Sequence, residues 1–125
     1  MIQFIDTHNR KNTPATCDSV IRYTREDGRV FFCPLYKSGW FCLNKFSLSK
    51  DGGLRLSPIS VGPTLSPTAV FDLLRTGELE LPYGGKLTLA SEAEALKELR
   101  VATVINGVLK DLEDMYDADL SDLRL

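Results

Sequence analysis

The sequence predicts an α+β fold, with an antiparallel sheet first and a long C-terminal helix last. Short runs of β-branched and aromatic residues, separated by glycine turns, occupy the first half of the chain. A short helix signal and a small hairpin follow near the middle. The segment from Ser91 to Tyr116 then keeps one helical period throughout. Strands followed by amphipathic helices favour a sheet with helices packed on one face.

Length and composition indicate one domain, residues 1–125, with its own core. The chain has 125 residues, of which 43% are hydrophobic and 26% charged, as in ordinary globular proteins. Its apolar runs are only a few residues long, so we expect no membrane contact. The N-terminus lacks the pattern of a secretory signal, and three unevenly spaced cysteines are typical of buried thiols. These features favour a cytoplasmic protein.

The predicted sheet is an antiparallel β-meander of about four to five strands. Its runs are 2–6, 19–25, 30–36, 40–48 and 54–61. Asp27-Gly28 supplies a tight turn, because glycine accepts the positive φ that such a turn needs. Pro34 cannot donate a hydrogen bond to a ladder and predicts a bulge or an edge strand. The polar residues 7–16 predict a loop.

A short helix and a small β-hairpin are predicted next. Ser66 is the expected N-cap, Pro67 the first helical residue and Gly77 the residue just past the end, so the helix runs from about Pro67 to Arg75. Leucines then alternate with charged residues over 78–89, as in a half-buried hairpin. The residues expected to point inward are Leu79, Leu81, Leu87 and Leu89.

The long helix is amphipathic. Ser91 and Glu94 stand at capping-box spacing at its start. Apolar residues then recur at spacings of four and three in one narrow arc: Val101, Ile105, Val108, Leu112 and Met115. We expect another part of the chain to cover this stripe, with the helix packed on the sheet. Leu96 and Leu99 lie on a different side, where they cover the edge of the hairpin or contact a second copy of the chain.

Charge is divided unevenly along the chain. Residues 1–58 hold nine Lys+Arg and five Asp+Glu, whereas residues 59–125 hold six and twelve. An acidic cluster ends the helix, where carboxylates oppose the helix dipole. Its members are Asp111, Glu113, Asp114, Asp117, Asp119 and Asp122. Two interpretations stay open: an acidic, solubilising tail over 117–125, or a surface that binds a basic partner.

An alternative is binding of single-stranded DNA or RNA by the meander. Aromatic residues there alternate with basic ones, and bases can stack on exposed rings while cations follow the phosphates. The residues expected to carry this function are Tyr36, Lys37, Trp40, Arg25 and Lys45. The competing interpretation is a sheet core surrounded by solvated Arg and Lys. The charge of the binding surface distinguishes the two hypotheses: it is basic in this one and acidic in the other.

The sequence gives little support to catalysis. His8 is the only histidine, and nothing places it within reach of Cys17, Cys33 or Cys42. The spacing of these four residues matches no zinc-ligand pattern. We therefore expect no catalytic residue, no metal ligand and no cofactor. A thiol or zinc enzyme built on these four residues is a third interpretation.

These observations predict a small, non-enzymatic regulatory protein that binds a macromolecular partner. The expected partner is a protein with a basic surface, which contacts the acidic end of the helix and exposed residues of the hairpin over 78–89. Such a module could inhibit or recruit a nucleic-acid-handling protein by occupying its basic surface. Homodimer formation through the helix stays open.

Overall fold

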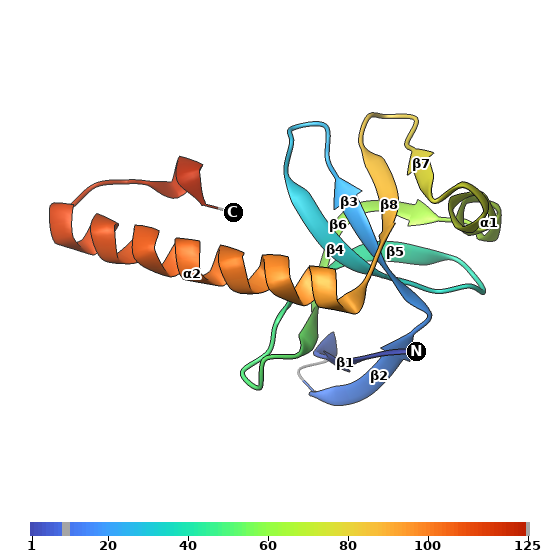
Figure 1. Cartoon of the computed structure of the whole chain (residues 1–125), viewed down its shortest axis with the longest axis horizontal. Coiled ribbons are helices and arrows are strands. Elements are labelled where there is room, and N and C mark those ends of the chain that lie inside the picture. The colour runs from blue at the N-terminus through green and yellow to red at the C-terminus, as the bar shows by residue number, and fades with distance from the viewer. Residues whose placement is uncertain (9–10, 125) are drawn as a thin grey trace.

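Two four-stranded sheets form the body of the molecule in a computed structural model that describes residues 1–8 and 11–124 (Figure 1). The first has the strand order β2-β1-β6-β5, with bounds Thr13–Cys17, Ile2–Asp6, Leu54–Leu65 and Phe41–Leu48. The second has the order β4-β3-β8-β7, with bounds Val30–Leu35, Ser19–Thr24, Lys86–Ala90 and Glu78–Glu80. Helices α1 (Pro67–Thr76) and α2 (Glu92–Tyr116) confirm the predicted α+β class.

The strands predicted as one meander are divided between the two sheets. β3 and β4 form an antiparallel hairpin in the second sheet, whereas β5 and β6 pair antiparallel in the first. Gly28 closes the β3–β4 turn at a φ of 88°, the conformation that the Asp27-Gly28 pair predicts. β4 is an edge strand, as Pro34 predicts. β6 continues to Leu65, past the predicted end at Val61.

Part of the predicted 7–16 loop is a strand. β2 pairs antiparallel with β1, from Cys17 opposite Ile2 to Thr13 opposite Asp6. The loop prediction is therefore wrong for residues 13–16, because pairing with β1 overrides their polar composition. Residues 9 and 10 of the predicted loop lie outside the described part of the chain. β1 also pairs parallel with β6, a contact between segments about 50 residues apart.

The local signals for α1 are confirmed. The Ser66 hydroxyl accepts a hydrogen bond from the Ala69 N–H at 3.1 Å, which satisfies a donor at the open helix end. Pro67 is the first residue of the helix. Gly77 follows the helix in the left-handed conformation, with a φ of 82°. Val70 and Leu73 face the core, so α1 is both capped and packed.

Two hydrophobic clusters form the core. Val20 and Ile21 are neighbours on β3 and point to opposite faces of its sheet, and both are fully buried. Ile21 belongs to a cluster with residues of α1 and of both sheets. Val20 belongs to a second cluster, which Phe4 and Ala95 join from β1 and α2. β3 is therefore buried on both faces.

The hairpin of β7 and β8 forms as predicted, with one difference. Leu87 is fully buried and Leu79 packs against the first cluster, whereas Leu89 is 37% exposed although the alternation places it inward. The Leu89 N–H donates to the carbonyl of Gly77 at 3.2 Å, which ties this strand to the end of α1. The alternation of leucine with polar residues therefore predicts the burial of Leu87 correctly, but its prediction that Leu89 is buried is wrong.

The three cysteines differ in accessibility. Cys17 and Cys33 are buried, and burial raises their pKa values to about 11 and about 12. Cys42, on β5, is exposed. The sequence prediction of buried thiols is therefore wrong for Cys42.

This contrast predicts selective thiol labelling. At pH 8, without denaturant, we expect a disulfide-exchange reagent to modify one thiol per chain, at Cys42. The buried thiols of Cys17 and Cys33 are protonated and shielded from the reagent. Denaturation should release the other two. Peptide mapping of the labelled protein checks the assignment, and rapid modification of Cys17 or Cys33 in the folded chain would contradict it.

Candidate protein interface

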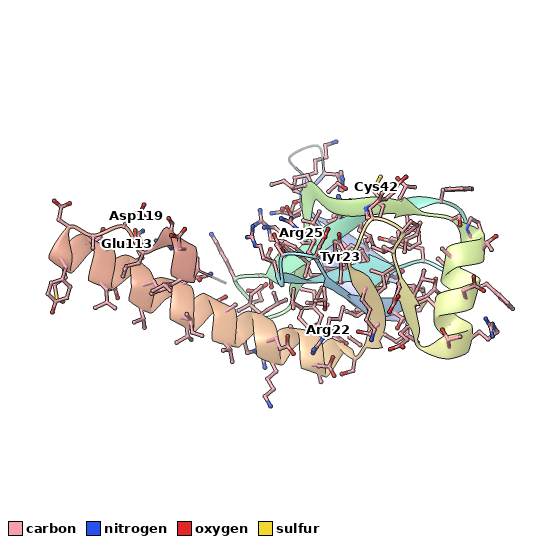
Figure 2. The ribbon with its side chains drawn as sticks, turned by 90° about the horizontal axis from the view of Figure 1, so that it is seen from above. Arg22, Tyr23, Arg25, Cys42, Glu113 and Asp119 are labelled. Carbon is pink, nitrogen blue, oxygen red and sulfur yellow. The ribbon has the colours of Figure 1, made fainter. Side chains whose placement is uncertain are left out.

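The first turns of α2 are anchored to the sheets. The Ser91 hydroxyl accepts the Glu94 N–H at 3.0 Å, so one half of the predicted capping box forms. The Glu94 carboxylate instead accepts from the Arg22 guanidinium of β3 at 3.1 Å, and Glu98 bonds the same guanidinium. Figure 2 shows Arg22 beside these turns. Leu96 and Leu99 pack against the second core cluster.

This packing corrects the predicted orientation of α2. Leu96 and Leu99, which the sequence assigns to the hairpin edge or to a second copy, are the side chains that dock α2 on the body. They lie on the opposite side of the helix from Val108, at 100° per residue. The stripe therefore points away from the sheets. The prediction that another part of the chain covers it is wrong for the described residues.

Beyond Leu99 the helix projects from the body into solvent (Figure 1). Its apolar stripe is exposed along this length. The exposed fractions are 50% for Val101, 66% for Val104, 37% for Ile105, 53% for Val108, 36% for Leu112, 70% for Met115 and 70% for Tyr116. Neither α1 nor α2 is long and apolar enough to cross a bilayer. The same helix also carries many charged residues.

The area of this stripe is large for a monomer. Its seven side chains expose on the order of 700 Å², close to the roughly 800 Å² that each partner buries in a standard protein interface. Single monomers seldom expose contiguous apolar patches of more than about 300–600 Å², and larger ones mark interaction sites. The stripe therefore has the size of one side of a protein interface.

The residues after α2 fold back along it. Asp117 takes the left-handed conformation at a φ of 50°, and its N–H donates to the carbonyl of Glu113. The chain then returns beside the helix, as Figure 1 shows, and Arg124 pairs with the Glu113 carboxylate. Leu109, on this flank of the helix, is only 9% exposed. The returning tail covers one flank of α2 and leaves the stripe open.

The tail that folds back along α2 engages only some members of the predicted acidic cluster. Glu113 pairs with Arg124, and Asp119 accepts the Ser121 N–H at 3.0 Å, which lowers the pKa of Asp119. Figure 2 shows Glu113 and Asp119 close together at the far end of α2. These two carboxylates, together with Asp117 as the helix cap, have structural roles in the tail. The solubilising interpretation does not require such contacts.

The other members of the cluster lie free. Asp111, Asp114 and Asp122 are exposed, and none forms an ion pair with a described residue. Asp111 lies beside Val104 and Val108 on the border of the stripe. Asp114 lies about five turns from Leu96, and therefore on the side of the helix away from the stripe. The stripe is therefore apolar at its centre and has one free carboxylate, Asp111, on the border opposite the tail.

The aromatic residues of the alternative hypothesis do not form a stacking surface. Trp40 is 72% exposed, but Tyr36 is half-buried, packs edge-to-face on Phe41 at 5.2 Å, and has its pKa raised to about 12 mainly by burial. The expectation that Tyr36 is exposed is therefore wrong. The remaining meander rings are buried or half-buried: Tyr23, Phe31, Phe32 and Phe46.

The basic residues of that hypothesis are also dispersed. The Arg25 guanidinium pairs with Asp27 at 2.7 Å and stacks over the ring of Phe31. Lys37 is exposed, and Lys45 is half-buried on β5. The structure brings Arg25 and Trp40 to the wall of one groove, described below, in which carboxylates outnumber cations. This arrangement opposes phosphate binding.

The residues of the third interpretation are not assembled. The His8 backbone N–H donates to the Asp6 carboxylate at 2.9 Å and lowers the pKa of Asp6. Cys17 donates to the Ser19 carbonyl at 3.2 Å, and its raised pKa opposes use as a nucleophile. Within residues 1–8 and 11–124, no three His, Cys, Asp or Glu side chains are placed to hold a metal ion.

The second predicted contact, the hairpin over 78–89, lies beside α1 and away from the free end of α2 (Figure 1). Glu78 on this hairpin pairs with Lys86 at 2.9 Å. The hairpin and the acidic helix end therefore do not form one surface.

Comparisons with protein-family models, with curated proteins and with solved structures found no match for this chain.

Proposed function

We propose that this chain is a non-catalytic protein-interaction module, and that α2 is its docking element. The partner presents an apolar groove bordered on one side by lysine and arginine side chains. The exposed stripe between Val101 and Tyr116 carries this proposal, because it leaves an interface-sized apolar surface in water. The body of the molecule holds the helix by its first turns and leaves the remaining turns accessible.

The spacing of the stripe suits recognition in a groove. Proteins that capture an amphipathic helix read anchors at three- and four-residue spacing along one face. Ile105, Val108 and Leu112 occupy the middle of this face and are the expected central contacts. Binding energy concentrates in a few such central, fully desolvated side chains. The ends of the stripe then exclude water from that centre.

The carboxylate on the border of the stripe indicates the charge of the partner. Asp111 lies free there, so a basic rim on the partner gives complementary electrostatics. Many proteins with such basic rims bind phosphates. The module would then inhibit or recruit a nucleic-acid-handling protein by occupying part of its basic surface.

A synthetic partner tests this chemistry. The probe is a fluorescein-labelled peptide of four heptads, with leucine at the a and d positions and lysine at e and g. The matched control peptide carries glutamate instead of lysine. We expect saturable anisotropy changes with the lysine peptide, at least tenfold tighter than with the glutamate peptide. Equal binding of both peptides, or binding of neither, would contradict the proposal.

The free carboxylate on the border of the stripe predicts the salt dependence. The variant Asp111→Asn should bind the lysine peptide up to about fivefold more weakly, since one rim pair contributes about 0.2–1 kcal/mol. Its affinity should also change less between 50 and 300 mM salt, because fewer charges are screened. Anisotropy titrations at both salt concentrations measure this. An unchanged salt slope would mean that Asp111 does not contact the peptide.

The same protein samples test whether a second copy of the chain covers the stripe. Sedimentation of the chain alone at 10 and 300 µM should show a monomer, because a parallel pair of α2 helices would bring two acidic ends together. A dimer that the Val108→Asp variant abolishes would make a second copy the occupant of the stripe. That result would overturn the proposal of a different partner.

A further inference from the structure

A groove of about 1000 Å³ lies on the body, apart from the stripe of α2. Its walls come from the β3–β4 turn, the end of β6, the start of α1, and β7 with the turn that follows it. Ligand sites are commonly concave, mostly apolar and of about this volume. Val61, Leu65 and Leu81 contribute apolar lining. Segments that are far apart in the sequence thus form one concave site.

Tyr23 forms the floor of this groove. Its ring lies against two glycines, because a Cβ on Gly62 would meet Tyr23 Cε2 at 2.8 Å and a Cβ on Gly85 would meet Cε1 at 3.2 Å. The residue is only 5% exposed, yet it lines the groove. Its hydroxyl forms no hydrogen bond with a described residue, yet no buried side-chain oxygen or nitrogen of the described residues lacks a partner. The hydroxyl is therefore open to solvent where Tyr23 lines the groove, and it is free to bond to a ligand there.

The lining of the groove holds more carboxylates than cations. Asp27 is paired with Arg25 at 2.7 Å, and Asp72 lies 3.8 Å from Arg75. Lys86 lies opposite Glu80 in the β7–β8 ladder, and its pKa is raised by its hydrogen bond to Glu78 and further by the charge of Glu80. Glu26 and Glu80 line the groove and form no ion pair with a described residue. These two carboxylates leave an excess of negative charge beside the apolar lining, and a cation is the ligand group that complements it.

The rim carries two exposed aromatic side chains. Trp40 is 72% exposed and Tyr83 is 90% exposed, and both line the groove. Aromatic faces attract lysine and arginine side chains as well as apolar ones. β6 adds an open strand edge: β1 pairs with it at Arg55 and Leu56, and past Leu56 its described ladder partner is β5. An open edge can pair with the backbone of an extended peptide.

We propose that this groove binds an extended peptide that carries a lysine or arginine side chain. The cation lies against Glu26 and Glu80, apolar neighbours fill the space beside Val61 and Leu81, and the Tyr23 hydroxyl bonds to the peptide backbone. This site is independent of the helix stripe. The chain would therefore contact peptide and protein partners through two separate surfaces.

The test uses a capped, fluorescein-labelled hexapeptide of alternating leucine and arginine, with a leucine–glutamate hexapeptide as the matched control. Anisotropy measures affinity, and the fluorescence of Trp40, the only tryptophan of the chain, reports the location in an unlabelled titration. We expect saturable binding of the arginine peptide with a change in Trp40 fluorescence. The glutamate peptide should show neither response.

Variants then assign the site. Glu26→Lys and Glu80→Lys should each weaken binding of the arginine peptide about tenfold, the size of one charge-assisted hydrogen bond. Tyr23→Phe should weaken it about threefold to fivefold. The control Asp51→Lys makes the same charge change on the β5–β6 turn, outside the groove, and should bind as the wild type does.

The groove proposal would be overturned by no saturable binding, by equal binding of the glutamate peptide, or by an equal loss in the Asp51→Lys variant. The Val108→Asp variant separates this proposal from that for α2. It should bind the arginine hexapeptide normally, since the stripe does not line the groove. A loss in that variant would place the hexapeptide on α2 and also contradict the groove.

Discussion

Replacing Val108 with aspartate is expected to weaken binding of the lysine heptad peptide at least about a hundredfold. Val108 is 53% exposed in the free chain and lies at the centre of the stripe. In the complex its replacement would be desolvated against leucine side chains without a partner, which costs several kcal/mol. A loss of about 3 kcal/mol corresponds to more than a hundredfold in affinity. Anisotropy titration of purified Val108→Asp measures this loss.

The control for this variant is Thr103→Asp. Thr103 is exposed on the opposite side of α2, so the substitution adds the same charge to the same helix without touching the stripe. It should bind the peptide within about twofold of the wild type. Both variants should unfold within about 0.5–1 kcal/mol of the wild type, as is usual for surface changes. An equal loss of binding in both would mean that α2 attracts the peptide only through its overall charge.

The second large effect concerns stability. Val70→Ala should lower the free energy of unfolding by about 1–3 kcal/mol, because Val70 is 2% exposed in the core and two buried methyl groups are removed. Val104→Ala makes the same change in α2, where Val104 is 66% exposed. It should be neutral or slightly stabilising, since alanine has the higher helix propensity. Urea unfolding of both variants measures the difference.

This pair also tests the exposure of the stripe. If Val104→Ala destabilised the chain as much as Val70→Ala does, the stripe would be buried by the chain itself in solution. The interface assigned to α2 would then not exist in the free protein. A similar dependence of unfolding on urea in both variants ensures that the same surface is exposed on unfolding.

The parts of the fold that the sequence predicts are those that depend on local chemistry. Ser66, Pro67 and Gly77 define α1 because a helix cap needs a side-chain acceptor, a preset φ and a left-handed residue within a few positions. Ser91 marks the start of α2 for the same reason. Gly28 closes the first hairpin through its positive φ.

The parts that the sequence does not predict depend on distant partners. β2 becomes a strand because β1 lies beside it, and β1 joins β6 in parallel across about 50 residues. The division of the meander into two sheets likewise depends on tertiary packing. No periodicity within these segments specifies such partners.

The orientation of α2 shows the same limit. The helix has two apolar sides, Leu96 with Leu99 near its start and the stripe further along. Periodicity measures how apolar each side is, but it does not say which one meets the sheet. One feature of the sequence could have indicated the orientation. Leu96 and Leu99 lie in the first turns of the helix, whereas the stripe lies in the later turns, and the body holds only the first turns.

The candidate sites divide in a similar way. The acidic cluster could be read from composition, but the structural roles of Glu113 and Asp119 depend on the return of the tail. The groove could not be predicted, because Glu26, Tyr23 and Glu80 come together only when β3, β6 and the β7–β8 hairpin meet. The sequence did not assign a face to Tyr23, and its position at the floor of a groove depends on Gly62 and Gly85.

The most direct test of the docking role of α2 is a map of amide chemical shifts in ¹⁵N-labelled protein, alone and saturated with the lysine heptad peptide. We predict that the largest changes fall between Val101 and Tyr116, on and beside the stripe, with small changes in the sheets. Changes concentrated around the groove or along β4 and β5, with α2 unaffected, would contradict the assignment of α2 as the docking element.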